Sequence, residues 1–162
     1  MRNSKKALAG VALSMACLLS AMDMPVASAA GNSSATGGGT AEEAGALSTF
    51  VFNAVKKSDG SVTGNLVYQV RGLDVTFMMT LDCLVVTGKV ATISGVVTHV
   101  IGDGLGFIFV GQEGVFKVED NGQGSKSNPD LFSDMILQPG ANCFDGPLPA
   151  PYIPVSGNIQ VR

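Results

Sequence analysis

The residues best suited to chemistry are few in this chain, and their spacing limits what they can do. His99 is the only histidine, so a Ser-His-Asp or Cys-His catalytic site would have to use it. It ends the apolar stretch VATISGVVTHV, shares the alternation of its inward positions and has no partner in view, which favours a structural role. One histidine, with the cysteines expected to be oxidised, leaves too few ligands for zinc. The sequence therefore predicts no catalytic residue and no cofactor.

Carboxylate and amide side chains gather in the stretch EDNGQGSKSNPD, where oxygen ligands could hold a calcium ion. The candidate ligands are Asp120, Asn121 and Asp130. The spacing fails the EF-hand pattern because its third position is Gly122, and Asp-Asn-Gly is also an ordinary turn-forming sequence. The stretch is predicted to be a surface loop in which a calcium site is the weaker interpretation.

Paired carboxylates are the other chemistry that these residue types allow, because an acid and a base can hydrolyse a glycosidic bond. Glu113, Glu119 and Asp120 fall in one predicted strand and its turn. The chain has no tryptophan and only two tyrosines, so the aromatic platforms common in sugar sites are scarce. A secreted carboxylate-based hydrolase ranks last among the functions considered.

The first residues have the layout of a secretory leader. A positive start with Arg2, Lys5 and Lys6 precedes a short apolar core, and PVASAA ends it in an A-x-A arrangement. Cleavage is expected after Ala29, with Ala30 as the second choice, so residues 1–29 are assigned to a signal peptide. Lipidation of Cys17 is unlikely because the apolar run continues past it. The sequence predicts a secreted or periplasmic protein with no membrane span, since no later stretch reaches the roughly 20 apolar residues that a span needs.

The segment that follows the leader is small and polar. Residues 30–46, AGNSSATGGGTAEEAGA, are predicted to be a flexible linker, and the folded domain is expected over residues 47–162. Cleavage removes three of ten Lys and Arg and one of thirteen Asp and Glu, which leaves a net charge near −5. An acidic domain without a basic cluster argues against nucleic acid and anionic membrane surfaces as partners.

Two cysteines survive cleavage, Cys83 and Cys143. An exported chain meets an oxidising compartment, where such a pair becomes a disulfide. No C-x-x-C pair and no nearby histidine supports a redox or nucleophilic role. Cys83 shares the alternation of the apolar residues around it, so its side chain is expected to point into the protein. Cys143 lies in a stretch rich in Pro and Gly, which the bond would fasten to a strand.

Alternation of apolar and polar residues predicts strands through most of the domain. Stretches with this period of two are separated by Gly-containing turns: STFVFNAVKK, VTGNLVYQVR, LDVTFMMTLDCLVV, VATISGVVTHV, FIFVGQEGVFKVED and VSGNIQVR. The fifth is expected to be interrupted between Gly111 and Gly114, and DLFSDMILQ fits a helical turn as well as a short strand. Seven or eight short strands predict a single all-β domain, either an antiparallel barrel or a barrel-like sandwich.

Two further functions are compatible with such a domain. The leading one is a non-enzymatic exported domain that binds a protein or contributes to the envelope or extracellular matrix. The alternative is a carrier, because a barrel of about eight strands can enclose one small apolar molecule. The candidate lining residues are Phe77, Met78, Met79, Phe107 and Phe109. Plain core packing is the simpler explanation for these five residues.

The succession of motifs also resembles a family of small exported bacterial domains that are generally uncharacterised. The motifs are FVFNAVKKSDGSVTGNLVYQ, LDCLVVTGKVATISGVV, VGQEGVFKVEDNGQGSKSNPD, a late Cys before a Pro-rich stretch, and GNIQV. The resemblance covers about residues 47–162. It implies an all-β secreted module with a disulfide between the hairpin cysteine and the late cysteine, here Cys83 and Cys143. It implies no activity, cofactor or catalytic residue.

Overall fold

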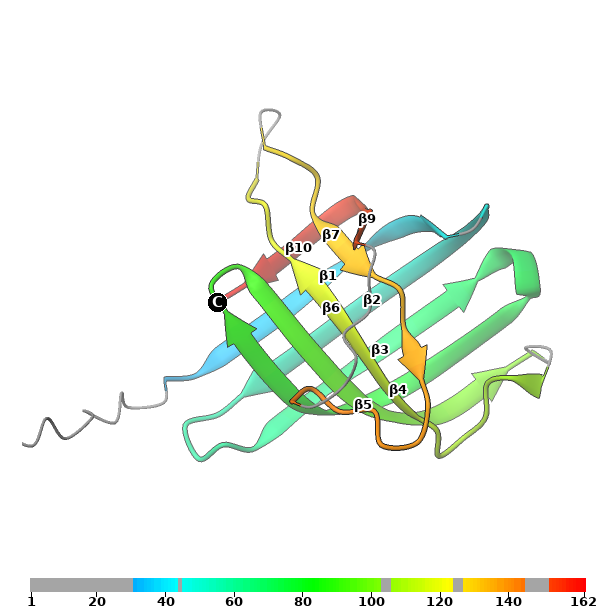
Figure 1. Cartoon of the computed structure of the whole chain (residues 1–162), viewed down its shortest axis with the longest axis horizontal. Coiled ribbons are helices and arrows are strands. Elements are labelled where there is room, and N and C mark those ends of the chain that lie inside the picture. Colours follow the sequence, from blue (N-terminus) through cyan, green and yellow to red (C-terminus); the bar gives the residue numbers. More distant parts are fainter. Residues whose placement is uncertain (1–30, 44, 103–105, 124–126, 145–151) are drawn as a thin grey trace, which may run out of the picture.

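The computed structural model describes residues 31–43, 45–102, 106–123, 127–144 and 152–162 (Figure 1). The predicted leader and Cys17 lie outside the described residues. The elements, in chain order, are β1 (Ser33–Glu43), β2 (Ala46–Lys56), β3 (Val62–Val70), the 3-10 helix η1 (Arg71–Leu73), β4 (Val75–Thr87), β5 (Val90–Ile101), β6 (Glu113–Glu119), β7 (Leu131–Ser133), β8 (Ile136–Leu137), β9 (Tyr152–Pro154) and β10 (Ser156–Val161). In this part of the chain, no helix is long and apolar enough to cross a membrane.

The strands form one antiparallel sheet that curls into a nearly closed barrel (Figure 1). Neighbouring strands follow the order β10-β1-β2-β3-β4-β5-β6-β7-β9, and β8 pairs separately with β6. Only Val155 separates β9, which pairs with β7, from β10, which pairs with β1. The last stretch of the chain therefore joins the two edges of the sheet. The prediction of an all-β domain is confirmed, and of the two architectures considered the structure has the barrel.

The prediction of a flexible linker over residues 30–46 is wrong. Strand β1 lies inside the sheet, paired with β2 on one side and β10 on the other. Its small residues are needed because β10 packs close beside it: a Cβ on Gly37 would lie 2.8 Å from Cγ1 of Ile159, and one on Gly39 would lie 2.6 Å from Cγ1 of Val155. The sheet therefore begins at Ser33 rather than near Leu47. Small residues that suggest a linker here reflect a tight strand contact.

An irregularity between β4 and β5 changes the direction of Cys83. Leu81 pairs with Gly95 and Cys83 pairs with Ser94, so Asp82 has no partner opposite it. The extra residue reverses the in-and-out alternation of β4. Leu84 is buried inside the barrel, and Cys83 lies on the outer face. The expectation that Cys83 points inward with the apolar set is wrong for this reason.

A second irregularity turns His99 outward by the same mechanism. Met78 pairs with His99 and Met79 pairs with Val97, which leaves Thr98 as the extra residue on β5. Val97 is buried in the core, whereas the side chain of His99 is exposed. The predicted inward alternation of His99 is therefore also wrong. A period of two cannot reveal a bulge, because the residues on both sides of it still alternate.

The predicted fifth strand begins later than its sequence indicates. Strand β6 starts at Glu113, and Phe107 to Gln112 form a loop. This loop is fixed to β5 because Gly111 N donates to Val97 O (2.8 Å) and Val97 N donates to Gln112 O (2.8 Å). Gly111 adopts a positive φ of 92°, which a β-branched or aromatic residue rarely takes. The ambiguous stretch DLFSDMILQ contains two short strands, β7 and β8.

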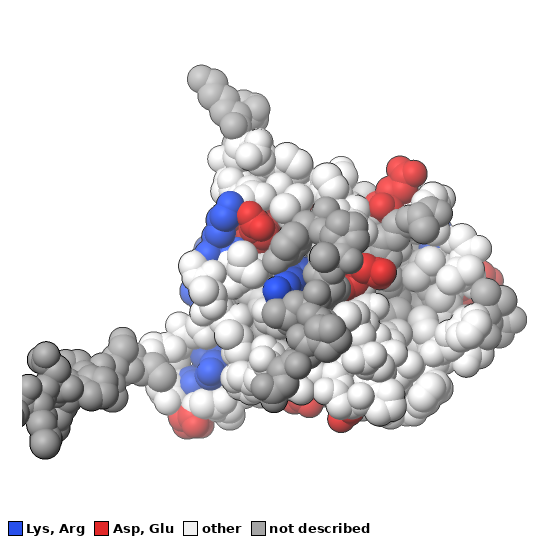
Figure 2. Space-filling view, in the orientation of Figure 1, with Lys and Arg blue, Asp and Glu red and all other residues white. Residues whose placement is uncertain are grey.

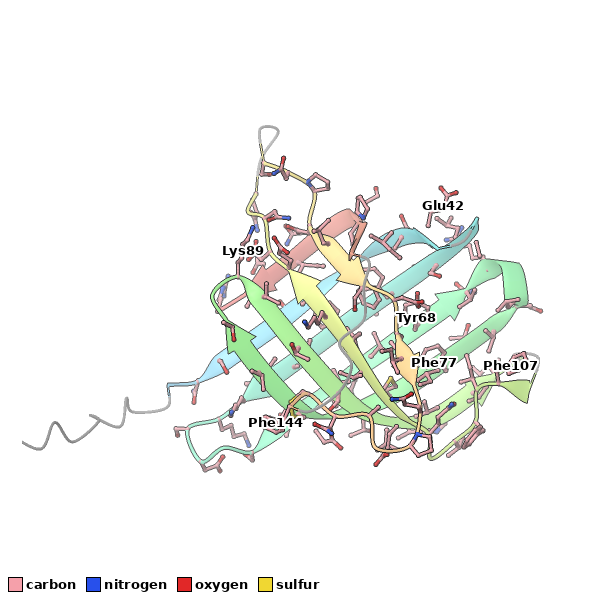
Figure 3. All side chains as sticks on the ribbon, viewed as in Figure 1. Glu42, Tyr68, Phe77, Lys89, Phe107 and Phe144 are labelled. Carbon is pink, nitrogen blue, oxygen red and sulfur yellow. A yellow bond between two sulfur atoms is a disulfide. The ribbon has the colours of Figure 1, made fainter. Side chains whose placement is uncertain are left out.

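The interior of the barrel is filled by aromatic rings. The closest pair, Phe50 and Phe132, has ring centroids 4.3 Å apart. Tyr68 packs on Phe77 with centroids 5.3 Å apart, and both side chains point into the barrel (Figure 3). Such contacts add about 0.5–1.5 kcal/mol per pair to the hydrophobic gain from burial. The six rings of the interior belong to Phe50, Phe52, Tyr68, Phe77, Phe116 and Phe132.

Candidate functional site

The predicted calcium candidates lie at the seam, which we define as the gap where β10 faces Asp120, Asn121 and Asp130. Asp130 is only 5% exposed. Its Oδ2 accepts a hydrogen bond from Ile159 N (2.6 Å), and its Oδ1 accepts one from Asn121 N (2.8 Å). Its backbone carbonyl accepts from Val155 N (2.8 Å). Asp130 thus accepts the backbone hydrogen bonds that a neighbouring strand would otherwise accept from this part of the chain.

Asp120 extends this arrangement along β10, whereas Asn121 bonds to residues outside that strand. Asp120 Oδ2 accepts from Val161 N (3.0 Å). Asn121 Nδ2 donates to the carbonyl of Pro129 (2.9 Å), and its Oδ1 accepts from Lys89 Nζ (2.6 Å). The structure therefore brings the three candidates together, but it directs their oxygens at N–H groups of the protein.

The side chains of the seam form hydrogen bonds that hold neighbouring parts of the sheet together. In the described ranges, no group of three or more His, Cys, Asp or Glu side chains is placed to hold a metal ion. Carboxylates that accept backbone N–H groups form strong, charge-assisted hydrogen bonds. Asp120 and Asp130 therefore accept hydrogen bonds from N–H groups of β10 that would otherwise pair with a neighbouring strand, and Asn121 bonds to Asp130.

The carboxylates considered for a hydrolase are spread along β6. Glu113 and Glu119 stand at its two ends, roughly 20 Å apart at 3.4 Å per residue. An acid and base pair in a glycosidase is roughly 5–9.5 Å apart. Glu119 forms an ion pair with Lys89 (2.7 Å), and Glu113 accepts a hydrogen bond from Gly140 N. This spacing cannot place Glu113 and Glu119 on the same glycosidic bond.

Asp82, the unpaired residue on β4, is the one carboxyl group in the described part of the chain whose pKa is raised. Loss of surrounding water is the main cause, and the nearby charge of Glu113 adds to it. Because the folded state holds this proton more tightly, the stabilisation from the neutral form is present at low pH. It is lost as the pH rises through and above the usual aspartate range near 4. Asp82→Asn is therefore expected to raise the melting temperature at pH 7 and to leave it unchanged at pH 3, measured by thermal unfolding.

Asp59 provides a matched control, because its pKa is shifted in the opposite direction to that of Asp82. The hydroxyl and the backbone N–H of Ser61 both donate to its Oδ1 (2.6 and 2.9 Å), and they lower the pKa of Asp59. The ionised carboxylate of Asp59 therefore stabilises the folded state above the usual aspartate pKa, and this stabilisation is lost as the pH falls. Asp59→Asn should therefore not raise the melting temperature at pH 7. If Asp82→Asn lowers it at pH 7, the charge of Asp82 does not destabilise the fold.

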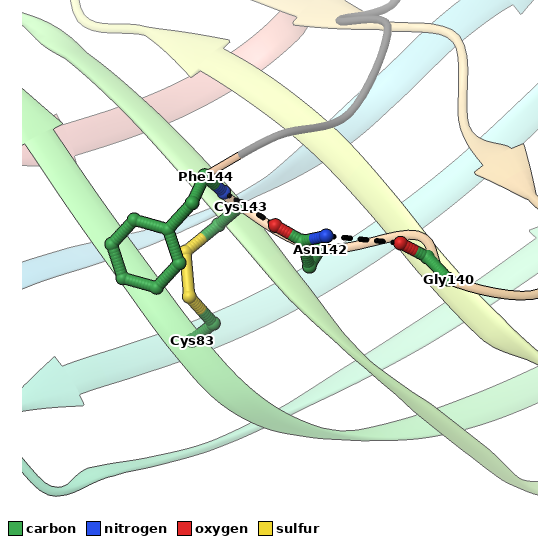
Figure 4. Close-up of a disulfide and its surroundings, with 5 residues drawn as sticks. All are labelled: Cys83, Gly140, Asn142, Cys143 and Phe144. Atoms are coloured by element: carbon green, nitrogen blue, oxygen red, sulfur yellow. Dashed lines mark hydrogen bonds between the residues drawn. A yellow bond between two sulfur atoms is a disulfide. The ribbon is translucent and has the colours of Figure 1, made fainter.

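The predicted disulfide is present and joins Cys83 of β4 to Cys143, with Cα atoms 6.0 Å apart (Figure 4). It holds the segment after β8 over the outer face of the sheet. On that face Thr92 and Ser94 of β5 are buried although they point away from the core. Cys143 itself is 4% exposed. The bond therefore fastens a covering segment, as the sequence indicated, but from the outside of the barrel.

The five residues proposed to line a carrier cavity do not share one compartment. Phe77 and Met79 are buried in the filled core, at 2% and 1% exposure. Met78 faces the outside of β4, and Phe107 and Phe109 are 74% and 56% exposed. Three hollows among the described residues, of about 220, 410 and 510 Å³, all open to solvent.

One of these hollows contains His99. It measures about 510 Å³ and lies on the outer face of β3, β4 and β5, beside Val67, Met78 and Thr98. Nδ1 of His99 is 3.3 Å from Oγ1 of Thr98. No carboxylate or cysteine is among the residues that line the hollow. The lining residues therefore include no acid that could orient the imidazole as in a triad.

A group of exposed apolar residues that local alternation does not predict lies at one end of the barrel, and we call it the apolar rim. Its members are between 41% and 74% exposed: Leu47, Leu73, Ile101, Phe107, Phe109 and Val110. They come from the start of β2, from η1, from the last residue of β5 and from the connection between β5 and β6. The available signal was the apolar content of IGDGLGFIFVG, which is unusual for a Gly-rich connection.

No family model matches this chain, and no curated protein or solved structure matches it either.

Proposed function

We propose that this chain is an exported, non-enzymatic binding domain that acts through its outer surface, in the periplasm or outside the cell. The observation that carries the proposal is the contrast between interior and exterior. Packed rings fill the barrel, whereas Phe107 and Phe109 are exposed at its rim. Contiguous exposed apolar surface on a small soluble domain commonly marks a contact with another molecule.

Two further features support export. The leader-like start of the sequence precedes a disulfide-containing domain, and disulfides persist in oxidising compartments. The resemblance to small exported bacterial modules agrees with this location. An apolar carrier is less well supported, because the side chains that would form its cavity are packed in the core or exposed.

Native mass spectrometry of the protein collected from its own producer tests this function. We expect a chain that begins at Ala30, is two hydrogens lighter than its reduced form, and carries no small molecule. The same sample measured under denaturing conditions is the control, since it reports the covalent mass alone. An extra mass that is lost on denaturation would instead identify a carrier and reveal the class of its ligand.

A further inference from the structure

Three members of the apolar rim, Leu47, Leu73 and Ile101, are brought together where the start of β2, η1 and the end of β5 meet at one end of the barrel. A Cβ on Gly72 of η1 would lie 3.5 Å from Cβ of Ala46, next to Leu47. The backbone of Gly102 packs against the carbonyl of Asp74, which places Ile101 beside η1. Figure 3 shows Phe107 toward this end and Lys89 toward the opposite one.

The apolar area of the rim is at the upper end of the range found on monomeric proteins. With full side-chain areas of roughly 150–200 Å² each, the exposed fractions correspond to roughly 600 Å² of apolar surface. The largest apolar patch of a typical monomer is roughly 300–600 Å². A standard interface buries roughly 800 Å² on each partner, of which polar surroundings supply a part. The rim and its border therefore suffice for one face of a stable dimer.

The charges around the rim are of both signs and are self-complementary. Arg71, Glu42 and Asp74 are exposed beside it. The only salt bridge found among the described residues is that of Lys89 and Glu119, so Arg71 has no such partner among them. Most of the prominent Lys and Arg side chains in Figure 2 lie toward the other half of that face. The acidic border disfavours an anionic lipid surface as the occupant.

We infer that the apolar rim is the contact between two copies of this chain, related by a two-fold axis. In such an isologous contact the same patch serves on both subunits. Phe107 and Phe109 would form its centre, and Arg71 would face Glu42 of the partner subunit at its border. The inference deepens the proposed function by naming the partner, and it rests on that function in taking the outer surface as the binding surface.

Sedimentation equilibrium of the secreted protein tests the inference. We expect the wild type to have twice the monomer mass at roughly 0.1 mM. The variant with Phe107→Ser and Phe109→Ser should raise the dimer dissociation constant about 100-fold or more, because exposed aromatic anchors dominate such contacts. Its melting temperature as a monomer should be unchanged. Val51→Ser is the matched control, since Val51 is 57% exposed on β2 but lies outside the rim, and it should leave the dimer intact.

A charge exchange tests the border of the same contact. Arg71→Glu and Glu42→Arg should each weaken self-association, and a mixture of the two variants should form a dimer of one copy of each. A wild type that stays monomeric at roughly 0.1 mM would overturn the inference, as would a dimer that survives loss of both rings. Binding of the monomer to neutral phosphatidylcholine vesicles through these rings would also overturn it. The proposed function fails separately, through a bound small molecule in the native mass spectrum.

Discussion

Asp130→Ala is expected to lower the free energy of unfolding by about 3–6 kcal/mol, the sum of two charge-assisted hydrogen bonds of about 1.5–3 kcal/mol each. The carboxylate accepts from Ile159 N and Asn121 N at a site that is 5% exposed. Its loss leaves the Ile159 N–H, which faces the seam, without an acceptor. Urea unfolding followed by circular dichroism measures the effect.

Two further variants show whether the loss of stability comes from the hydrogen bonds of Asp130 or from the removal of any acidic side chain. Asp130→Asn should lower the free energy of unfolding nearly as much as Asp130→Ala, because an asparagine has a single oxygen and places an NH₂ group opposite one of the two donors. Asp134→Ala is the matched control: its exposed carboxylate accepts only from the adjacent Met135 N, so a change within about 0.5 kcal/mol is expected. If Asp130→Ala and Asp134→Ala cost the same, the seam is not held by Asp130.

Removal of the disulfide by Cys83→Ser with Cys143→Ser is expected to lower the free energy of unfolding by about 2–4 kcal/mol. The bond joins residues 60 positions apart, and the entropy of closing a loop of this length gives an upper value of about 4 kcal/mol. The loss should also raise the amide exchange of the covering segment, Gly140 to Phe144, more than that of β2. Denaturant unfolding and hydrogen exchange measure the two effects.

Reductant provides the control for this prediction. Added dithiothreitol should lower the stability of the wild type to that of the double serine variant, and it should not change the variant. The barrel itself is expected to remain folded, because the strands beneath the segment are held by their own ladders. Equal stability of oxidised and reduced wild type would show that the bond does not stabilise the fold.

Much of the sheet was predictable because local alternation survives folding. Strands β2 to β5 and β10 fall where the period of two places them, and their turns contain the expected glycines. The disulfide was predictable for a different reason, since only two cysteines follow the predicted leader, and two cysteines allow only one intramolecular pairing. The placement of Asp120, Asn121 and Asp130 near one another was anticipated, whereas their role in holding β10 was not.

Other features depend on contacts that no local pattern records. The small residues of β1 resemble a linker until β10 is placed beside Gly37 and Gly39. The directions of Cys83 and His99 depend on single unpaired residues in β4 and β5. A bulge has no signature in a sequence that keeps alternating on both sides of it.

The sequence by itself determined that this protein is an all-β domain with one disulfide, and it indicated export. These properties follow from composition, alternation and cysteine count, which act over a few residues. Only the tertiary structure decided that Asp130 and Asp120 bond to β10 at the seam of the nearly closed barrel, that the interior is filled by rings, and that Phe107 and Phe109 stay outside. Each of these depends on side chains far apart in sequence coming within contact distance, because barrel closure sets which groups are buried and which must find a partner elsewhere.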